Sequence, residues 1–499
     1  MADVRPALGS AYGASLGGAR AAVLTRLWRA LAFEPLPWIA RREHGPGSLT
    51  LLLADGRRLE GPAADPYATD AYVREVSLDG RTHRQAARLI EALGVPHGGA
   101  FAAEVDDSTA SLALSRAGAA ERARAQARDP DTTWEWEQRV VDGHPYHPNC
   151  RSRPGFSVAE QLAYAPEHRP VVRLATVSVG ARECLVTGGW PDHLRDGDRI
   201  LIPVHPWQAE HVLKGEDRYG DPERAAIDAH PLMALRTLAP AAGGPHVKTA
   251  LSTRLTSAVR DISAYSVETA AVVSAFAQSL SERLEGRLHI TRTLGAVTAH
   301  TSDLAAVLRE PPEVYAGPGE RVVPVAALAG TDLARSAAWQ AEFARLALSV
   351  CLRVLDLGVA LEAHGQNLLV VLSPDGRPLR LVYRDLADIR ISPARLARHG
   401  LPVPPLTGRL VTDDETVLRR KLFGSLAAGA LAATAGSSAA FGEALTSALD
   451  GLPPTADSAP LLRGPLPVKA LTLMRLSPGI PGDQWADLPH PAAGGRIGG

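Results

Sequence analysis

Two apolar runs separated by an Asp-Gly pair are the feature that most restricts how this chain folds. LEAHGQNLLVVL (361–372) is followed by SPDG (373–376) and then by RPLRLVYRDLAD (377–388). Asp-Gly between apolar runs predicts a β-hairpin, because glycine supplies the positive φ that a tight turn requires. With Asp375 and Gly376 as the central turn residues, Gln366 is expected to face Asp385 across the two strands.

The open end of this predicted hairpin is polar. It gathers Glu362, His364, Gln366, Asn367, Arg384 and Asp385. Glu362 and Asp385 are predicted to hold Mg²⁺ through carboxylate oxygens, with nucleotide phosphates completing the shell. His364 can donate a hydrogen bond to a substrate carboxylate. The alternative is that these polar groups only satisfy one another, but so many at one mouth favours a functional site.

A second group of cations and hydroxyls lies in ALRTL (234–238) and HVKTALSTRLTSAVR (246–260). Period-two spacing places Lys248, Ser252, Arg254 and Thr256 on one strand face. We expect a strand to about Leu255, with Thr256 capping a helix that carries Arg260. Cations beside hydroxyls suit a triphosphate, although the segment is not a P-loop. The alternative is a solvated basic strand face.

GHPYHPNCRSRPGF (143–156) brings His144 and His147, each before a proline, close to Arg151 and Arg153. Extended backbone of this kind can present imidazoles and guanidiniums to an anion. A metal site with Cys150 and a histidine turn that packs the core are the alternatives. IPVHPWQ (202–208) predicts a strand that ends in a turn, and on its own favours packing.

Composition restricts the class of protein. The 499 residues include 45% hydrophobic residues and carry a net charge of -1, with three scattered cysteines. These values indicate a large folded protein with no disulfide framework, which fits a cytoplasmic location, and no basic excess for binding nucleic acid or membrane. The start has no signal-peptide pattern. The uncharged stretch 422–442 is rich in Ala, Gly and Ser, so a packed helix is favoured over a membrane span.

The periodicity predicts a mixed α and β enzyme. Helices are expected at 21–31, 111–127, 267–284 and 337–357, strands at 170–179 and 199–204, a hairpin at 49–61, and a disordered tail at 490–499. We divide the chain into 1–134, 135–335 and 336–499.

Together, GHPYHPNCRSRPGF, IPVHPWQ, ALRTL with KTALSTRLTSAVR, EAHGQN, YRD and LPVKALTLMRL (466–476) resemble the IucA/IucC family of NRPS-independent siderophore synthetases. The resemblance implies an α+β, multi-lobed cupped hand. The three regions become a thumb-like lobe, a fingers lobe with nucleotide contacts and a mostly helical palm lobe. ATP and a carboxylate would bind between fingers and palm, and a homodimer is expected by analogy.

The resemblance also implies roles for single residues. Arg236, Thr237 and Lys248 would contact nucleotide phosphates, and Gln366 and Asn367 would lie near the nucleotide, as would Arg151 and Arg153. Thr256, Arg260, His364 and His147 would hold the carboxylate, with Arg260, His364 and Lys248 serving catalysis. Glu362 and Asp385 would bind Mg²⁺.

Three positions depart from the family pattern. Arg151 replaces a frequent lysine, Ala234 a frequent hydroxyl residue, and Asp388 a usual glycine, which puts the loop conformation there in question. The chain is also shorter than most members.

The motifs therefore predict an ATP-dependent ligase that adenylates citrate or a related acid and joins it to an amine or hydroxyl. A small-molecule kinase is the first alternative, but the catalytic-loop position lacks an aspartate. A non-catalytic protein that binds citrate or a siderophore is the second alternative.

Overall fold

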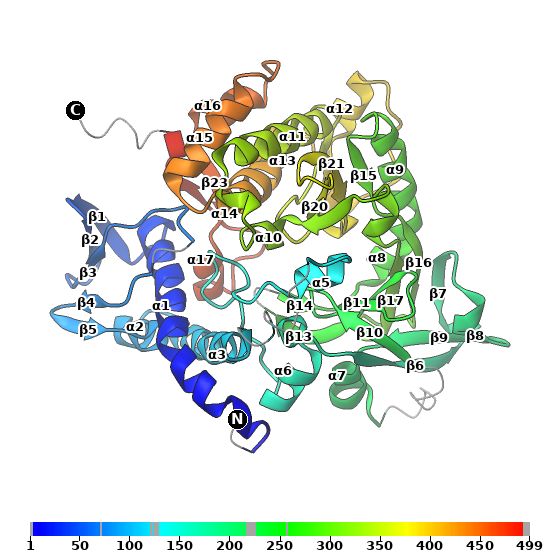
Figure 1. The fold of residues 1–499 in the computed structure, drawn as a ribbon, viewed down its shortest axis with the longest axis horizontal. Helices are drawn as coiled ribbons and strands as arrows, with labels where there is room; N and C mark the ends of the chain where they lie inside the picture. The colour runs from blue at the N-terminus through cyan, green and yellow to red at the C-terminus, as the bar shows by residue number, and fades with distance from the viewer. Residues whose placement is uncertain are drawn as a thin grey trace.

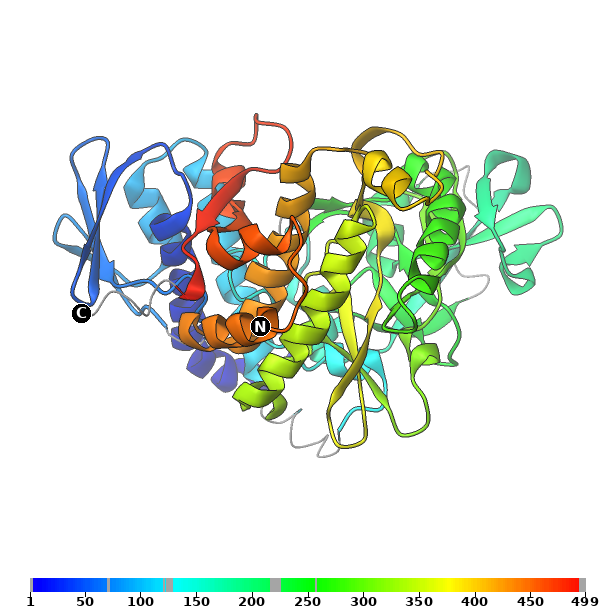
Figure 2. The same ribbon diagram turned by 90° about the horizontal axis from the view of Figure 1, so that it is seen from above.

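Three sheets, each with its own helices, lie side by side along the molecule. The computed structural model describes residues 3–69, 72–119, 122, 129–215, 226–255 and 258–492. Figures 1 and 2 show the N-terminal sheet at one end, the largest sheet at the other and the C-terminal helices between them. The predicted multi-lobed α+β fold is confirmed.

The N-terminal sheet is antiparallel, with strands in sequence order. Its strands are β1 (Ile39–Gly45), β2 (Ser48–Leu53), β3 (Arg58–Pro62), β4 (Val76–Leu78) and β5 (Arg81–His83). Helices α1 (Gly9–Phe33), α2 (Ala86–Leu93) and α3 (Gly98–Ala117) accompany it. The predicted hairpin at 49–61 is confirmed by the β2–β3 register. The predicted helix at 111–127 begins earlier, at Gly98, and part of its range lies outside the described residues.

The largest sheet has nine strands, in the order β7-β16-β17-β12-β11-β10-β6-β9-β8. They are β6 (Val172–Gly180), β7 (Leu185–Gly188), β8 (Arg195–Asp196), β9 (Arg199–Val204), β10 (Ile227–Pro231), β11 (Thr237–Pro240), β12 (His246–Thr249), β16 (Thr293–Thr298) and β17 (Ala305–Arg309). Helices α8 (Ala264–Glu268) and α9 (Ala270–Glu282) pack against β7 and β16. The sheet brings β12 and β17 together, and both carry cations at the cleft.

The third sheet has the order β15-β21-β20-β18 and contains the predicted hairpin. Its strands are β15 (Leu288–Ile290), β18 (Arg321–Pro324), β20 (Leu368–Leu372) and β21 (Pro378–Tyr383). Leu368 pairs with Tyr383, and Arg384 N donates to Asn367 O, so the predicted register holds at the mouth. The expected turn centre is wrong by one residue. Gly376 N donates to Ser373 O, which makes Pro374 and Asp375 central, and a bulge at Leu379, opposite the step from Val371 to Leu372, restores the register.

The segment after β12 differs from the prediction. The chain forms a separate two-stranded pair, β13 (Leu251–Leu255) and β14 (Ala258–Arg260), so Arg260 lies on a strand and not on a helix. The next helix, α8, is capped by Ser263, whose Oγ accepts from Ser266 N. Thr256 lies outside the described residues. The break at Ala250 also separates Lys248 from Ser252, which bonds Gln208 and Asp303.

Helices fill the C-terminal region around the third sheet. They are α10 (Val325–Leu328), α11 (Ala337–Asp356), α12 (Pro393–Arg398), α13 (Glu415–Leu422), the π-helix η10 (Phe423–Leu431), α14 (Ala432–Ala435), α15 (Ser438–Leu449), α16 (Ser458–Arg463) and α17 (Leu471–Leu476). Short strand pairs complete it, β19 (Val359–Ala360) with β22 (Arg390–Ile391) and β23 (Leu466–Lys469) with β24 (Trp485–Leu488). In the described residues no helix is long and apolar enough for a membrane span. The small residues of 422–442 instead permit close packing: a Cβ on Gly424 would lie 2.9 Å from the Trp485 ring.

The third sheet takes β15 and β18 from 288–324, within the predicted fingers region, and the three-region division stays a prediction. Most of the predicted disordered tail, 493–499, lies outside the described residues.

Candidate active site

A cavity of about 1210 Å³ opens between the three sheets. Its wall includes Arg26 of α1, the 139–153 segment, Lys248 of β12, Arg309 of β17, the mouth of the β20–β21 hairpin and Lys469 of β23. Ten of the side chains that line it are Lys or Arg and six are Asp or Glu. The surplus of cations suits a polyanionic ligand.

Lys248 and Asp385 form the central ion pair. Lys248 Nζ donates to both carboxylate oxygens of Asp385, at 2.8 and 3.0 Å. Arg309, buried at the end of β17, lies 3.4 Å from Asp385 as well. Burial lowers the pKa of Lys248 to about 8, against the opposing effect of the Asp385 carboxylate. Burial would raise the pKa of Asp385, but Lys248 and Arg309 outweigh it and hold that pKa well below its ordinary value.

The backbone at Asp385 is strained. Its φ is 72° and its ψ is 86°, in a left-handed region that a non-glycine residue adopts at a cost. The side chain of Asp385 is thereby turned toward Lys248, directly after the last residues of β21. Strain of this kind persists where the surroundings impose it, and it occurs often at functional sites.

Arg236 and Arg260 lie beside this pair. Arg236 Nη1 donates to the backbone carbonyl of Arg260 and, at 2.7 Å, to that of Asp261. Arg260 donates to Leu255 O at 3.2 Å. Burial lowers the pKa of Arg236 to about 10, which leaves it charged at neutral pH. Thr237, in register with Lys248, lines the same cavity.

The hairpin mouth is held by backbone contacts. His364 Nδ1 accepts from Gln366 N at 3.2 Å, which leaves Nε2 to carry the proton of a neutral ring. Burial lowers the pKa of His364. Arg384 donates twice to Gln366 O and forms an ion pair with buried Glu137, so it is a structural residue. His364, Gln366 and Asn367 line the cavity.

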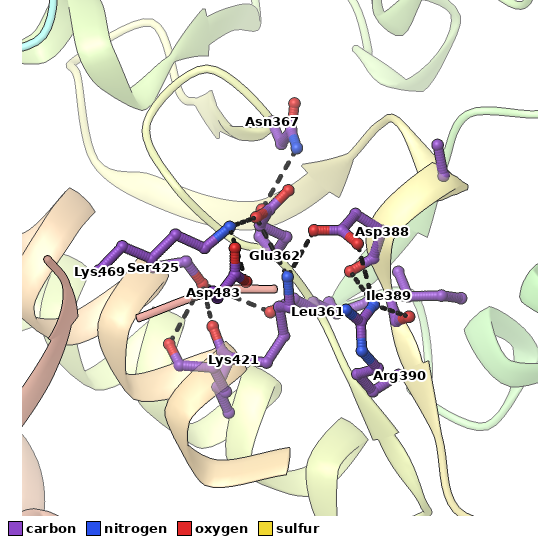
Figure 3. Close-up of polar contacts among 12 residues, drawn as sticks. Leu361, Glu362, Asn367, Asp388, Ile389, Arg390, Lys421, Ser425, Lys469 and Asp483 are labelled. Carbon is purple, nitrogen blue, oxygen red and sulfur yellow. Dashed lines mark hydrogen bonds and ion pairs between the residues drawn. The ribbon is translucent and has the colours of Figure 1, made fainter. Parts of the chain in front are cut away.

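Glu362 lines the cavity and lies in a cluster of alternating charges (Figure 3). Its Oε1 accepts from Lys421 Nζ at 3.2 Å and from Lys469 Nζ at 3.1 Å. Lys421 also contacts Asp388 at 2.5 Å, and Lys469 contacts Asp483 at 3.2 Å. Asp388 is further paired with Arg390 at 2.9 Å. The usual glycine of the family is not needed here, because Asp388 is not among the positive-φ residues.

The two predicted metal ligands, Glu362 and Asp385, line one cavity but are each held by cations. In the described part of the chain, no group of three or more His, Cys, Asp or Glu side chains is arranged to hold a metal. Mg²⁺ that enters with a nucleotide needs only one or two protein carboxylates, so the donor set fits such an ion and not an all-protein cage.

The His-Pro segment forms another part of the cavity wall. His147 is 1% exposed, and neither ring nitrogen has a hydrogen-bond partner among the residues that the structure describes. Arg151 and Arg153 line the cavity too, but both are paired with buried Glu167, at 3.0 and 2.7 Å. Glu167 therefore compensates part of the charge that the two guanidiniums carry. His205 is a packing residue, as expected: its Nδ1 accepts from Trp207 N and caps α7 (Pro206–Gln208).

Sequence reasoning missed Arg309, Lys421, Lys469, Glu137 and Arg26. The position of Arg309 at the end of an apolar strand is a weak signal that its charge could face a site at the edge of the sheet. Lys421 and Lys469 lie 59 and 107 residues from Glu362, and no local pattern reports such pairings.

Geometry and fold together define a multi-lobed α+β protein with a large, cation-rich cleft. The IucA / IucC family model matches residues 132–330, and a model described as "Ferric iron reductase FhuF-like transporter" matches residues 337–477. The match to the IucA / IucC model agrees with the resemblance that the motifs showed.

Curated relatives match over part of their length. A Bacillus anthracis citryl-spermidine/3,4-dihydroxybenzoyl-citryl-spermidine:spermidine ligase is 25% identical over 319 residues, 51% of each chain. A Staphylococcus aureus D-ornithine–citrate ligase is 22% identical over 363 residues, 58% of this chain and 55% of the relative. The matches thus span about half the length of these relatives.

Solved structures match over nearly the whole chain. The petrobactin biosynthesis protein AsbB of B. anthracis has a TM-score of 0.76 at 18% identity, covering 97% of this chain and 96% of AsbB. ATP-bound aerobactin synthetase IucA of Klebsiella pneumoniae has a TM-score of 0.73 at 20% identity, covering 95% and 99%. At this identity the likeness establishes the fold.

Proposed function

We propose that the protein is an ATP-dependent ligase of siderophore biosynthesis that activates a carboxylate as an acyl-adenylate and transfers the acyl group to an amine or hydroxyl. One observation carries the proposal: Lys248, Arg236 and Arg260 share a cavity with His364 and the mouth of the hairpin. Adenylation requires this arrangement, since a polyphosphate and a carboxylate must be held together against their mutual repulsion.

The residues divide between the two anions. Lys248, Arg236 and Thr237 bind the phosphates of ATP, with Gln366 and Asn367 beside the nucleotide. Arg260 and the Nε2–H of His364 hold the carboxylate, with Thr256 and His147 as further contacts. A carboxylate oxygen attacks the α-phosphorus, and pyrophosphate leaves. An amine then attacks the acyl carbon, AMP leaves, and the amine loses its proton.

Mg²⁺ would be held by Glu362 and Asp385 together with the phosphates, and would supply charge neutralisation at the phosphates. Both carboxylates are now compensated by lysine and arginine. Phosphates that bind Lys248 would leave Asp385 available to the ion. Arg151 and Arg153, predicted as nucleotide contacts, would act mainly by fixing the wall through Glu167.

Citrate is the first acid to test, because the relatives include ligases named for citrate and for citryl-spermidine. A cytoplasmic location and a homodimer remain part of the proposal by analogy with the family.

The test is to measure AMP and pyrophosphate from ATP over a grid of carboxylic acids, with hydroxylamine as a general nucleophile. We expect stoichiometric AMP and pyrophosphate that depend on the acid. ADP as the product would instead support a small-molecule kinase, because a strand lysine and an aspartate after a hairpin are also typical of kinases. Acid binding without consumption of ATP across the grid would support a non-catalytic binding protein.

A further inference from the structure

The carboxylates that line the cavity are almost all neutralised within the protein. Asp385 is paired with Lys248 and Arg309, Glu362 with Lys421 and Lys469, Asp388 with Lys421 and Arg390, Asp483 with Lys469, and Asp142 with Arg116. The sixth, Asp261, is exposed at the rim. An ammonium group deep in the cavity would therefore find no carboxylate that is not already shared with a protein cation.

Several arginines that line the same cavity are, by contrast, not paired with a carboxylate of the described residues. Within the described residues, Arg26, Arg236 and Arg260 line the cavity and form no ion pair; they donate to neutral acceptors instead. The proposed function assigns Arg236 and Arg260 to ATP and to the carboxylate that is activated. Arg26 has no role in that scheme, although it is 5% exposed and carries a full charge.

Arg26 reaches the cavity from the N-terminal lobe. It lies on α1, left of centre in Figure 1, whereas β11 and β14 lie to the right of centre. Its three nitrogens donate one bond each: Nε to Pro145 O at 3.1 Å, Nη1 to Cys150 Sγ at 3.0 Å and Nη2 to Asp142 O at 3.1 Å. A guanidinium has five N–H groups, so one on each terminal nitrogen is left over. Two such N–H groups are what a carboxylate needs for paired hydrogen bonds.

Arg26 is also close to the reacting centre. It holds the backbone of 142–150, the segment that carries His144 and His147. Burial, followed by the nearby charges of His364 and Arg26, lowers the pKa of His144 to about 3. Burial lowers the pKa of His147 well below its ordinary value, and the nearby charges of Arg26 and Arg260 lower it further. Arg26 therefore acts on the same histidines as the residues that hold the activated acid, but from the opposite lobe.

We propose that the acceptor of the acyl group carries a carboxylate of its own: it is an amino acid whose carboxylate binds Arg26, and not a diamine or polyamine. The inference rests on the proposed function. Almost all of the carboxylates that line the cavity are paired with protein cations, so they offer a polycation no free counter-charge. Arg26 is a buried guanidinium with two N–H groups that are not used in its hydrogen bonds to the protein.

The experiment compares acceptors that differ only by a carboxylate. Ornithine is paired with 1,4-diaminobutane, lysine with 1,5-diaminopentane, 2,3-diaminopropanoate with 1,2-diaminoethane and serine with ethanolamine, with spermidine as the polyamine. Hydroxylamine, which is small and uncharged, reports whether acyl-adenylate forms at all. Its failure with every acid would reject the proposed function and not the acceptor class alone.

Where hydroxylamine reacts, we expect at least one amino acid to exceed its decarboxylated partner by tenfold or more in kcat/KM. A decarboxylated partner or spermidine that equals or exceeds the amino acids would overturn the proposal, as would a panel in which no amino acid rises above the uncatalysed rate. The wild-type comparison decides the acceptor class without any variant.

Variants then test Arg26 itself. In Arg26→Gln the ratio of kcat/KM within the preferred pair should fall toward one, mainly through the KM of the amino acid, and Arg26→Lys should restore part of it. Arg42→Gln removes another arginine that donates to backbone carbonyls of the same lobe, at Leu31 and Glu34, and does not line the cavity. An unchanged ratio in Arg26→Gln, with hydroxylamine still reacting, would exclude Arg26 as the carboxylate contact.

Discussion

Lys248 Nζ lies 2.8 Å from Asp385 Oδ2, and this contact joins the largest sheet to the hairpin sheet across 137 residues of sequence. It brings the predicted phosphate-binding strand to the predicted polar mouth. Without it the cations of 236–260 and the His364 segment could belong to separate surfaces. The pair thus provides the shared cleft on which a carboxylate-activating mechanism depends.

The same pair predicts a pH dependence. A lysine binds a triphosphate in its charged form, and burial lowers the pKa of Lys248 to about 8. The Lys248 side chain is therefore mostly charged below pH 8 and mostly neutral above it. We expect kcat/KM for ATP to fall about tenfold from pH 7 to pH 9. In Lys248→Arg the guanidinium stays charged, so this alkaline loss should disappear from the profile. Parallel profiles for the two proteins would remove Lys248 from nucleotide binding.

Arg260 is expected to be needed for chemistry and not for folding. Arg260→Ala should lower acid-dependent AMP formation by at least about a hundredfold, because a guanidinium that bridges carboxylate and phosphate compensates the charge of the transition state. Among the described residues its guanidinium makes one structural hydrogen bond, to Leu255 O, which contributes little to stability. Arg254→Ala is the matched control, since Arg254 lies exposed on the same strand pair. Equal activity in the two variants would exclude Arg260 from the site.

The hairpin was predictable because its signals are local. Two apolar runs with Asp-Gly between them identify both strands. The predicted register holds at the polar mouth because a bulge offsets the error of one residue in the turn centre. The placement of Arg260 on a helix was wrong for a related reason. Thr256 and Ser263 are both acceptable caps, and only the pairing of Leu251 with Arg260 across the β13–β14 pair selects the second.

The sequence did not predict which charged side chains pair with one another in the fold. The pattern of Arg151 and Arg153 indicates an anion, and the structure supplies one from the protein itself, Glu167. Lys421 and Lys469 likewise meet Glu362 only after the chain has folded. Sequence spacing reports which groups share a strand face, but not which distant partner neutralises them.

Glu34 predicts how stability changes with pH. It is buried at the end of α1, and its carboxylate accepts from Thr472 N and Leu473 N of α17. Burial raises its pKa from 4.5 to about 7. Between these values the folded state holds a proton that the unfolded state has released, so the group contributes most below pH 4.5 and its contribution falls as pH rises to 7.

Glu34→Gln removes this titration. Relative to wild type, the variant should gain stability from pH 5 to pH 8, by up to roughly 3 kcal/mol. Chemical denaturation of both proteins at several pH values measures the difference, in which other titrating groups cancel. A difference that is constant with pH would show that Glu34 titrates normally.

The Lys421–Asp388 pair predicts a coupled stability effect. Lys421 is 2% exposed and is shared by Asp388 and Glu362, which are 25% and 17% exposed. Lys421→Met leaves two carboxylates without this ammonium, and we expect a loss of about 2–3 kcal/mol, less than for a fully buried pair because both carboxylates reach solvent. Adding Asp388→Asn to Lys421→Met should recover part of that loss.

A double-mutant cycle in denaturant measures this coupling. Arg353→Met serves as the control, since Arg353 and Asp356 form an exposed pair on α11 whose loss should cost under about 0.5 kcal/mol. If the two changes at Lys421 and Asp388 instead add without interaction, the contact does not stabilise the folded state. Asp388, at the position of a usual family glycine, would then have no structural role in the orientation of Glu362.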